Sequence, residues 1–422
     1  MVDSDHNYRR DFYRALNVRQ GAQTEEFERY YVPIYAQPDG PAGPDVVNEI
    51  ATAIDFTAGG SVLLLSGYRG AGKTTELMRL ERELDREVYL PVYFDIEDYF
   101  NTELPLDAGT FLIGLAAGFV DNCEEIDGLK QKLYDRIRTF FQRIDIDAEL
   151  SASVSEGPAS LDLRATLRDD ESFRAQVKKA LESNRKTFKK EMHAFFDELV
   201  DSLPENKTPV FIVDSIEHYR GRSSTFDEVR DSVEALFSRY ASELALPGMH
   251  VVYTVPTYVS PMGWGNLFWP VLNVKVRERS GEDCREGIDL LRQVLTQRAP
   301  DGDVERLLGA ETERVIRASG GLFRELFRLV SALLLKNGPL PVRPEDVDQV
   351  ERQQRSQAVA GLTQEQWEIL RQVKETQQFI NPRELSSEAW SLQAYGLVLC
   401  YRNGTVDWWG VNPLLEPLLD ED

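Results

Sequence analysis

Short apolar runs alternate with helical patterns along the first part of the chain. A helix is predicted over residues 44–56, and a second predicted helix, ending at Leu84, separates the first apolar run from the next. Continuous apolar runs of this length are typical of strands buried on both faces of a parallel sheet. Because strands alternate with helices, the pattern predicts an α/β fold. The predicted strands are residues 61–66, 88–96, 209–214 and 250–255.

The region between the second and third predicted strands, residues 107–203, breaks this alternation, and we interpret it as an insertion. Apolar and polar residues alternate over residues 144–154 and again over 161–167, on either side of a Gly-Pro turn. That period of two predicts a β-hairpin, which is marginal alone and needs a cover for its apolar face. A long amphipathic helix is predicted next, with apolar residues at helical spacing from Val177 to Leu199.

The last third of the chain is predicted to be helical from about residue 282 to 335. Three prolines then mark a break: Pro339, Pro341 and Pro344. Thr363 starts a capping box with Gln366 for a helix over residues 364–377. A second helix, near residues 388–395, leads to two apolar runs joined by Asn403-Gly404, a strong hairpin signal. Helices followed by such a hairpin predict a winged helix.

We therefore predict four parts. An N-terminal segment covers residues 1–43, and an α/β domain containing the insertion covers 44–280. A helical lid follows over residues 281–355, and the winged-helix domain occupies 356–422. A length of 422 residues agrees with several domains.

Composition narrows the classes of function. The chain has 48 Lys and Arg against 71 Asp and Glu, a formal net charge of −23. This field repels phosphate, so it disfavours a protein that coats nucleic acid or an anionic membrane, although a local basic patch is not excluded. The longest apolar stretch, residues 111–120, is too short to span a bilayer. With no signal-peptide pattern and three dispersed cysteines (Cys123, Cys284 and Cys400), we expect a cytoplasmic protein without membrane contact.

Residues 67–74 read Gly-Tyr-Arg-Gly-Ala-Gly-Lys-Thr, a phosphate-binding motif. The motif follows the first predicted strand and begins the next predicted helix, which is the context that it requires. Its glycines let backbone N–H groups approach phosphate oxygens, and Lys73 adds a positive charge for the β- and γ-phosphates. The alternative is a chance glycine turn. The predicted nucleotide-binding residues are Gly67, Tyr68, Arg69, Gly70, Ala71, Gly72, Lys73, Thr74 and Thr75.

A carboxylate from a neighbouring strand is needed to hold Mg²⁺ at such a loop. Residues 210–214 read Val-Phe-Ile-Val-Asp, so Asp214 emerges at the carboxyl end of a buried strand. We predict that Thr74 and Asp214 ligate Mg²⁺, with ATP as the bound nucleotide. Glu217 is a candidate for polarising the attacking water, or else a solvated loop acid.

The segment from Asp214 through Ser215 to Glu217 resembles the Walker B variant of STAND NTPases, especially the NACHT type, within the AAA+-related ASCE group. In that family a small residue follows the Mg²⁺ aspartate, and the next acid comes later. Ordinary AAA+ enzymes place Glu directly after the Asp, and this chain does not. The resemblance implies that Thr254, at the end of the next strand, is a polar sensor; the alternative is an ordinary strand-end hydroxyl.

Gly320-Gly321-Leu322-Phe323-Arg324 resembles the sensor-2 segment of origin-recognition-type AAA+ ATPases, which implies that Arg324 contacts the γ-phosphate. STAND proteins usually carry a proline in this segment, which this chain lacks. The histidine that STAND winged helices often place on the nucleotide is also missing. Because no sensor repeats or effector domain follow, the resemblance implies separate sensor and effector partners, a homo-oligomer, or both.

Other residues have two interpretations each. Tyr31, Val32 and Pro33 either border the adenine or belong to the core. Trp390, Trp408 and Trp409 are predicted to be core or interface residues rather than stacking platforms. From Leu362 onward four basic residues face ten acidic ones, which disfavours nucleic acid on the winged helix. Candidate arginine fingers are Arg220, Arg222, Arg239, Arg277 and Arg279.

Together these features predict a P-loop NTPase with an inserted hairpin and helix, a helical lid and a winged helix. The predicted function is a STAND-like switch that binds ATP, hydrolyses it slowly and controls assembly or partner engagement. By analogy alone, prokaryotic antiphage defence is the expected setting. The alternatives are an AAA+-type DNA-remodelling or loader ATPase, which predicts DNA contacts at Arg383 and Arg402, and a scaffold that binds ATP without turnover.

Overall fold

The computed structural model describes residues 2–17, 24–35, 40–123, 130–143, 159–203, 206–221, 225–259, 263–264, 267–379 and 387–420. The chain forms two compact units, each assembled from separate stretches of sequence. The first unit contains Met1–Val46, Gly67–Glu76 and Pro270–Asp422, and the second contains Val47–Ser66 and Leu77–Trp269. None of the helices in the described residues is both long and apolar enough to span a membrane.

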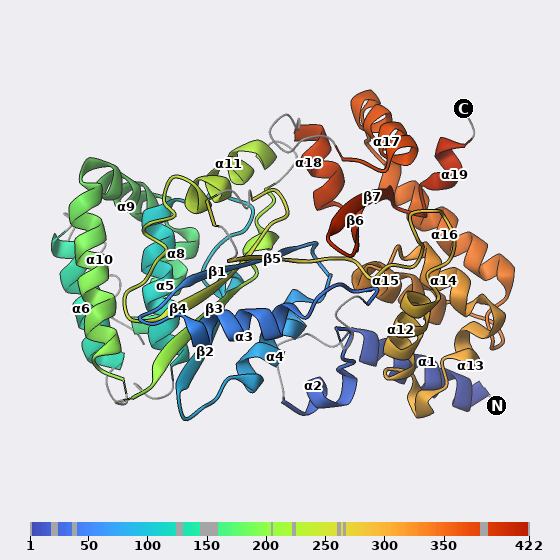
Figure 1. The fold of residues 1–422 in the computed structure, drawn as a ribbon, viewed down its shortest axis with the longest axis horizontal. Coiled ribbons are helices and arrows are strands. Elements are labelled where there is room, and N and C mark those ends of the chain that lie inside the picture. Colours follow the sequence, from blue (N-terminus) through green and yellow to red (C-terminus); the bar gives the residue numbers. More distant parts are fainter. Residues whose placement is uncertain are drawn as a thin grey trace. The chain divides into compact units, whose positions relative to one another are not determined.

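A five-stranded sheet forms the centre of the second unit (Figure 1). In space the strands are ordered β2, β3, β4, β1 and β5. Pairing is parallel between β2 and β3, β3 and β4, and β4 and β1. Their bounds are β1 Val62–Gly67, β2 Tyr89–Asp95, β3 Thr208–Asp214, β4 His250–Val255 and β5 Phe268–Val271.

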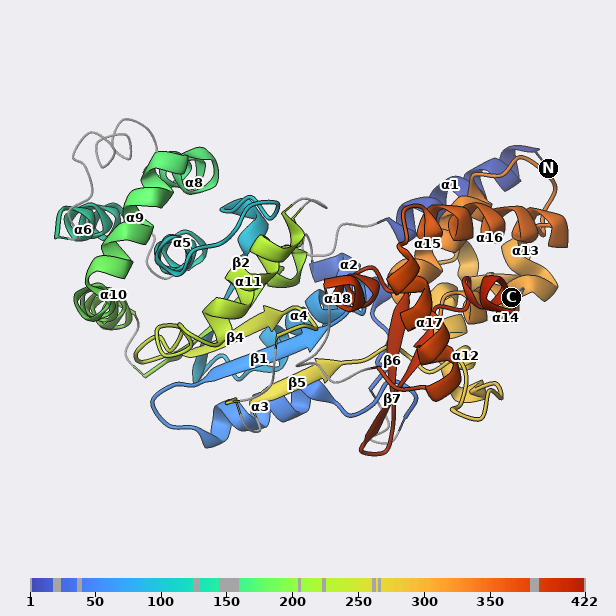
Figure 2. The same cartoon turned by 90° about the horizontal axis from the view of Figure 1, so that it is seen from above.

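The central strands are buried from end to end, which explains their unbroken apolar sequences. Every residue of β1 and β4 is buried, as are all residues of β3 after its first. Helix α3 (Val46–Phe56) lies on one face of the sheet, and α5 (Ala108–Asn122) and α11 (Phe226–Phe237) lie on the other (Figure 2). The predicted α/β fold with a parallel sheet is therefore confirmed.

All four predicted strands are present, with ends shifted by at most a residue or two. The short strand β5 was not predicted, because its four residues contain Pro270 and lack a run of β-branched residues. It lies beside β1, where the Leu64 amide donates to the Leu267 carbonyl at 2.9 Å.

Helices fill the insertion between β2 and β3. The apolar stretch of residues 111–120 lies within α5, where these residues are all buried. Helices α6 (Lys130–Arg143), α8 (Ala159–Asp169) and α9 (Glu171–Ser183) pack against α5, and α10 (Arg185–Val200) packs against α6 and α9. Phenylalanine pairs build the core of this bundle, including Phe141 with Phe173 at 5.3 Å between ring centroids.

The predicted hairpin is wrong in its second arm, which is helix α8. Leu163 and Leu167 are four residues apart, a spacing that fits a strand face and a helix face equally well. Ala165, which a strand would have placed beside them, is exposed. The first arm, residues 144–154, lies outside the described residues.

The single long helix predicted through Val177 and Leu199 is two helices. Asn184 interrupts it with φ −150° and ψ 69°, and its side chain accepts a hydrogen bond from the Thr187 amide at 3.1 Å. A residue that caps one helix and starts the next can preserve the apolar periodicity on both sides, so the pattern alone did not reveal the break.

The described residues of the first unit are mostly helical and include one antiparallel hairpin. Helix α1 (Val2–Leu16) packs against α15 (Phe323–Leu334), where Arg9 donates to the carbonyls of Leu333 and Leu334 at 3.2 and 3.1 Å. The remaining helices of the N-terminal and predicted lid regions are α2 Thr24–Tyr30, α12 Arg285–Thr296, α13 Glu305–Leu308, α14 Thr312–Ala318 and α16 Pro344–Val359.

The winged helix is formed as predicted. Helices α17 (Gln364–Thr376) and α18 (Ser387–Ala394) precede the antiparallel strands β6 (Val398–Asn403) and β7 (Val406–Val411), and α19 (Glu416–Leu419) follows. The predicted capping box at Thr363 is present. Leu370, Leu392 and Leu415 are among the residues of its buried apolar core.

Candidate functional site

The predicted phosphate loop connects strand β1 to helix α4 (Lys73–Glu83), as the motif requires. Gly70 and Gly72 have φ values of +86° and +99°, a region that residues with a Cβ rarely adopt. An added Cβ at Gly70 would overlap the Cβ of Arg324. Glycine is therefore required at this position both by the backbone and by its neighbour.

Lys73 starts α4 and is almost fully buried, with 2% of its surface exposed. Its Nζ donates hydrogen bonds to the carbonyl oxygens of Gly67 and Tyr68, both at 2.9 Å. The ammonium is thus held over the loop itself. Thr74 and Thr75 follow in the first turn of α4, where the backbone amides of a helix point at an incoming anion.

Arg324 comes from the first turn of α15, far along the sequence, and meets this loop. Its backbone amide donates to the Gly70 carbonyl at 3.3 Å. Its Nε would lie 3.0 Å from a Cβ placed on Gly70, so the side chain runs along the loop. The structure therefore brings Arg324 to the predicted phosphate loop, and its contact with the γ-phosphate stays a prediction.

The loop fits a bound phosphate chain by its donors. Besides Lys73 and Arg324, the Nε of Arg69 is buried without a hydrogen-bond partner among the described residues. Buried donors are nearly always satisfied in folded proteins, and an anion held by the loop would satisfy this one.

Tyr68 differs from the other predicted nucleotide-binding residues in where its side chain goes. The ring is buried, and its hydroxyl lies 3.5 Å from the amide nitrogen of Gln393 on α18. Burial raises the pKa of this hydroxyl well above its ordinary value. The backbone of Tyr68 is part of the loop, where its carbonyl accepts a hydrogen bond from Lys73, but its side chain packs against the winged helix.

A small hollow of about 40 Å³ lies beside the loop, lined by Gly72, Thr75, Tyr31 and Val32 among others. The predicted adenine neighbours Tyr31 and Val32 are therefore next to the loop, whereas Pro33 is exposed and does not line the hollow. Sequence reasoning missed Arg298 of the chain after α12, whose guanidinium lies over the ring of Phe327 at 4.8 Å. Burial lowers the pKa of Arg298 to about 10.

Asp214 ends β3 and is completely buried. Its Oδ1 accepts a hydrogen bond from the Ser215 amide at 2.7 Å, and its Oδ2 accepts one from the Tyr93 hydroxyl, also at 2.7 Å. Ser215 has φ +73°, which turns the chain sharply after the strand. Thr254 at the end of β4 accepts a hydrogen bond on its Oγ1 from the Ile216 amide at 3.1 Å, and so holds this turn.

Glu217 lies on the short 3₁₀ turn Ile216–His218 and is 8% exposed, so it is not a freely solvated loop acid. Sequence reasoning missed Asp95, which pairs in register with Asp214 at the same edge of the sheet. Burial, followed by the nearby charges of Glu97 and Asp98, raises the pKa of Asp95. The signal was available in principle, because Asp95 also ends an apolar strand.

The candidate arginine fingers have different surroundings. Arg277 forms a salt bridge with Glu416 and donates to the Val411 carbonyl at 3.4 Å, and Arg279 bonds to Gln377 at 3.1 Å, so both hold the winged helix. Arg239 lies over the ring of Tyr240. Arg220 is described, but Arg222 lies outside the described residues, as does Arg383 of the winged helix.

The winged-helix aromatics are partly explained by packing. Trp408 is buried, with its ring 4.7 Å from that of Tyr401, and Trp409 packs against the core of the winged helix. Arg402 forms a salt bridge with Asp407. The hairpin of the winged helix is therefore well packed, and the salt bridge with Asp407 neutralises the charge of Arg402.

No family model matches the chain, and no curated protein matches it. Among solved structures it is similar to the crystal structure of Cdc6p from Pyrobaculum aerophilum, with 13% sequence identity and a TM-score of 0.32. That match covers 96% of this chain and 95% of the other.

Proposed function

We propose that this protein is an ATP-binding switch in which the phosphate loop controls the position of the winged helix. The observation that carries the proposal is Tyr68. This residue belongs to the phosphate loop, yet its side chain is buried against α18 with its hydroxyl near Gln393. A loop that rearranges around a triphosphate moves a side chain on which the winged helix packs.

A second connection supports the same coupling. Arg324, bonded to Gly70, follows the Gly320-Gly321 turn, in which both glycines have positive φ. The Gly320 carbonyl accepts a hydrogen bond from the Tyr401 hydroxyl of β6 at 2.8 Å. A Cβ on Gly320 would overlap Leu399, so the turn is in tight contact with the wing. Rigid packing of this kind transmits small displacements.

The chemistry assigned to the site is hydrolysis of the bond between the β- and γ-phosphates, at a slow rate. Lys73 and Arg324 would neutralise charge on the phosphates, and the loop amides would orient them. Mg²⁺, held through Thr74 and Asp214, would supply further neutralisation, since this ion is usually bound by one or two carboxylates together with phosphate oxygens. Glu217 would accept the proton of the attacking water, and Thr254 would hold the Asp214–Glu217 turn in place.

The first experiment separates binding from turnover. Lys73→Ala should abolish ATP binding in calorimetry and phosphate release together. Glu217→Gln should retain binding within about threefold and lose at least about 100-fold in phosphate release, the size typical of a lost general base. Glu228→Gln, on the exposed surface of α11, is the matched control and should change neither. Binding without turnover in the wild type would establish the scaffold alternative, and absence of binding would refute the proposal.

The second experiment tests the switch. ATP with Mg²⁺ should change amide hydrogen exchange in α18 and β6, and light scattering on the same sample should report any change of oligomeric state. Tyr68→Ala should leave ATP binding measurable but uncouple it from exchange in α18, while Tyr68→Phe keeps the buried ring and serves as the control. Unchanged exchange in the wild type at saturating ATP would contradict the switch.

The STAND resemblance extends the proposal to its setting. A switch of this kind would act through a homo-oligomer or through separate sensor and effector proteins, with antiphage defence as the expected pathway. Light scattering with and without ATP-Mg²⁺ is the measurement that distinguishes self-assembly from partner engagement.

A further inference from the structure

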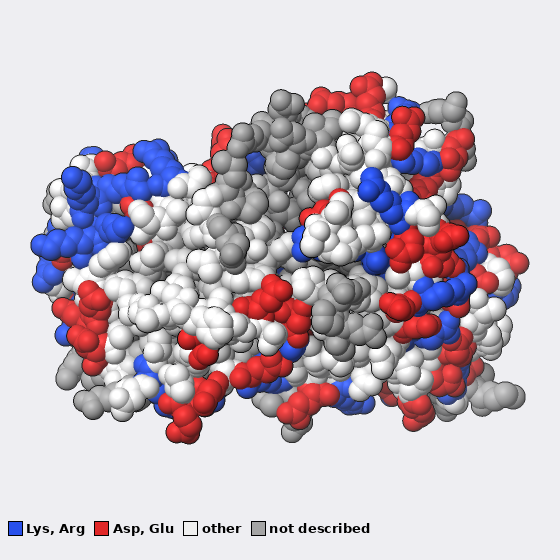
Figure 3. Space-filling view, in the orientation of Figure 1, with Lys and Arg blue, Asp and Glu red and all other residues white. Residues whose placement is uncertain are grey.

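A basic surface lies on the helical insertion of this acidic protein. Residues 171–190, which form α9 and the start of α10, contain seven Lys or Arg and two Glu, although the whole chain has a net charge of −23. Figure 3 shows Lys and Arg side chains gathered over these two helices. The basic residues are Arg174, Lys178, Lys179, Arg185, Lys186, Lys189 and Lys190.

The charges on this surface are of two kinds. Arg185 forms a salt bridge with buried Glu243, and Lys189 donates to the Ser242 carbonyl at 2.9 Å, so both have a structural role. Lys179, Lys186 and Lys190 are exposed and have no carboxylate within salt-bridge distance among the described residues. We call these three lysines the corner lysines, because they flank the turn between α9 and α10.

The neighbouring helix α6 shows that the corner lysines are unusual. Its arginines are neutralised within the bundle: Arg136 pairs with Glu198 at 3.0 Å, Arg138 with Asp135 at 3.4 Å, and Arg143 with Glu191 at 2.8 Å. In a chain with an excess of carboxylates, an exposed cation can readily find a partner. Three neighbouring lysines without one therefore point to an external anion.

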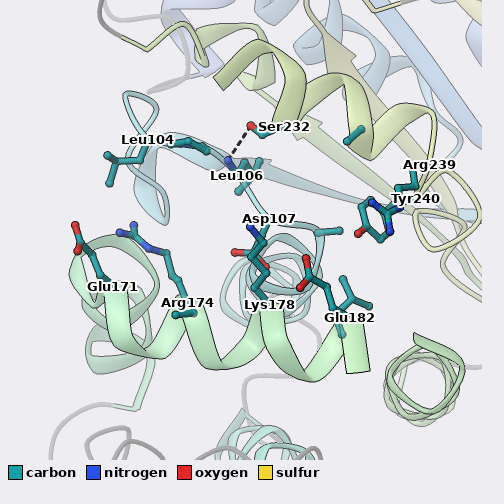
Figure 4. Close-up of a pocket in the computed structure, with 15 residues that line it drawn as sticks. Leu104, Leu106, Asp107, Glu171, Arg174, Lys178, Glu182, Ser232, Arg239 and Tyr240 are labelled. Atoms are coloured by element: carbon teal, nitrogen blue, oxygen red, sulfur yellow. Dashed lines mark hydrogen bonds between the residues drawn. The ribbon is translucent and has the colours of Figure 1, made fainter. Parts of the chain in front are cut away.

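A hollow of about 430 Å³ adjoins this surface, and its lining shows where the positive charge lies (Figure 4). Arg174 and Lys178 rise into it from α9, with Arg239 and Tyr240 across from them. The hollow itself is balanced, because three carboxylates line it as well: Asp107, Glu171 and Glu182. The excess of positive charge is thus on the open corner outside the hollow, where an extended ligand can reach it.

The position of Lys186 has an electrostatic cost that such a ligand would remove. Lys186 lies in the first turn of α10 next to Arg185, whose charge is paired with Glu243, and that turn holds no acidic residue. The N-terminus of a helix carries a partial positive charge, so cations there are destabilising and anions are stabilising. A phosphate placed over this turn would meet the helix end and the corner lysines together.

The composition of the surface favours a phosphodiester backbone over a protein. Lysine is depleted in protein–protein interfaces, whose centres are rich in aromatic residues and arginine. Here the exposed neighbours of the corner lysines are small or polar (Ser172, Ala175, Ser183 and Thr187), together with one carboxylate, Glu182, and no large apolar side chain. Clustered lysines without apolar anchors match contacts to nucleic-acid phosphates, which carry affinity without reading sequence.

We infer that the α9–α10 corner binds the phosphate backbone of a nucleic-acid duplex, independently of sequence and away from the winged helix. The acidity of the rest of the chain confines this contact to the insertion. The inference does not depend on ATP binding, so its test uses the full-length protein without nucleotide.

The experiment measures fluorescence anisotropy of labelled duplexes of about 20 base pairs, DNA in one arm and RNA in the other, between about 50 and 200 mM salt. The wild type should bind at least one of them, with an affinity that falls steeply as salt rises. In the triple variant Lys179→Gln, Lys186→Gln, Lys190→Gln, affinity at 100 mM salt should fall on the order of 100-fold, and the salt slope should decrease by about three, one for each lost phosphate contact.

Two control variants make the result decisive. Replacing the corner lysines by arginine (Lys179→Arg, Lys186→Arg, Lys190→Arg) keeps the charge and should keep binding. A matched triple variant on the winged helix (Arg371→Gln, Lys374→Gln, Arg402→Gln) removes as many charges elsewhere and should bind like the wild type. Circular dichroism and thermal unfolding check that each variant is folded.

The inference is wrong if the wild type binds neither duplex at the lowest salt. It is equally wrong if the corner variant binds like the wild type, or if the winged-helix variant loses as much affinity. Binding of polyglutamate in the absence of duplex binding would also overturn it, because the surface would then serve an acidic protein partner.

Discussion

Gly70 is the residue at which the phosphate loop is most constrained. Its backbone needs a positive φ, its carbonyl accepts the amide of Arg324, and the Cβ of Arg324 occupies the space that a side chain would need. The motif in the sequence explains the first of these requirements. The other two come from a helix that lies some 250 residues later in the chain.

Replacing Gly70 by alanine should therefore cost more than a positive φ alone. We expect Gly70→Ala to lower the free energy of unfolding by at least about 2 kcal/mol, because strained backbone and steric overlap add. Gly404→Ala, at φ +57° with no atom near its Cβ, should cost only about 1 kcal/mol and is the control. Urea denaturation measures both. Equal losses would mean that the Arg324 contact is not rigid.

The residues around Asp214 show which parts of the site can be predicted from the sequence and which cannot. Asp214 was predicted because it ends an apolar run, and Glu217 because it lies three residues later. Thr254 was predicted because the STAND resemblance implies a polar sensor at the end of the next strand. Tyr93, which donates to Asp214, was not predicted, because its partner lies on a different strand. Register between strands decides that contact, and no local pattern specifies it.

At the scale of elements, helix α5 depends on the capping residue that precedes it. Asp107 caps it, accepting a hydrogen bond from the Thr110 amide at 2.8 Å. Burial raises the pKa of Asp107 above its ordinary value. The folded state therefore loses stability as the pH rises through the range of this carboxyl. The loss is absent below the unfolded pKa of about 3.9 and is complete once the pH is above the raised pKa of the folded state.

Asp107→Asn should for this reason raise the urea midpoint at pH 7, since asparagine keeps the cap and carries no charge. The gain over the wild type should shrink as the pH is lowered toward about 4. Asp107→Ala removes the cap and should instead cost about 1 kcal/mol at both pH values. A gain from asparagine that grew at low pH would show that burial is not the cause.

Asp121 joins several elements of the insertion. It accepts hydrogen bonds from Tyr99, from Tyr134 at 2.5 Å and from Arg164 at 2.8 Å, which come from three different segments around α5. Only 5% of its side chain is exposed. Removing one member of a buried network leaves its partners unsatisfied.

We expect Asp121→Ala to lower the free energy of unfolding by about 3 kcal/mol. Asp135→Ala removes an exposed pair with Arg138 in the same bundle and should change it by no more than about 0.5 kcal/mol. Thermal and urea denaturation of the three proteins would test this. Comparable effects of the two substitutions would refute a special role for Asp121.

At the scale of the whole molecule, the excess of acidic residues should make stability depend on salt. The chain has 71 acidic and 48 basic residues, so in the folded state the repulsion between like charges outweighs the attraction between opposite charges. Raising NaCl from about 10 to 150 mM shortens the screening length from about 30 to 8 Å.

The urea midpoint should therefore rise with NaCl over this range. Sucrose at the same osmolality, which does not screen charge, is the control and should have a smaller effect. A midpoint that fell with salt would mean that the ion pairs contribute more than the net repulsion removes.

The division into two units also belongs to this scale. Residues 67–76, the phosphate loop and first turn of α4, are grouped with the helices and winged helix of residues 270–422 rather than with the strand from which they continue. Sequence order had assigned this loop to the α/β domain, over residues 44–280. Packing of Gly70 on Arg324 and of Tyr68 near Gln393 accounts for the grouping.

The sequence by itself determined the buried strands, the phosphate loop, the winged helix and its capping box, because each is written in neighbouring residues as apolar runs, glycines, caps and turns. Only the tertiary structure decided that residues 159–169 form a helix. The spacing of four residues between Leu163 and Leu167 fits both a strand and a helix, and packing selects the helix. It likewise brought Arg324 and Gln393 to the loop and left the corner lysines without partners. Those features depend on which distant segments meet, and contact between distant segments leaves no local pattern in a single sequence.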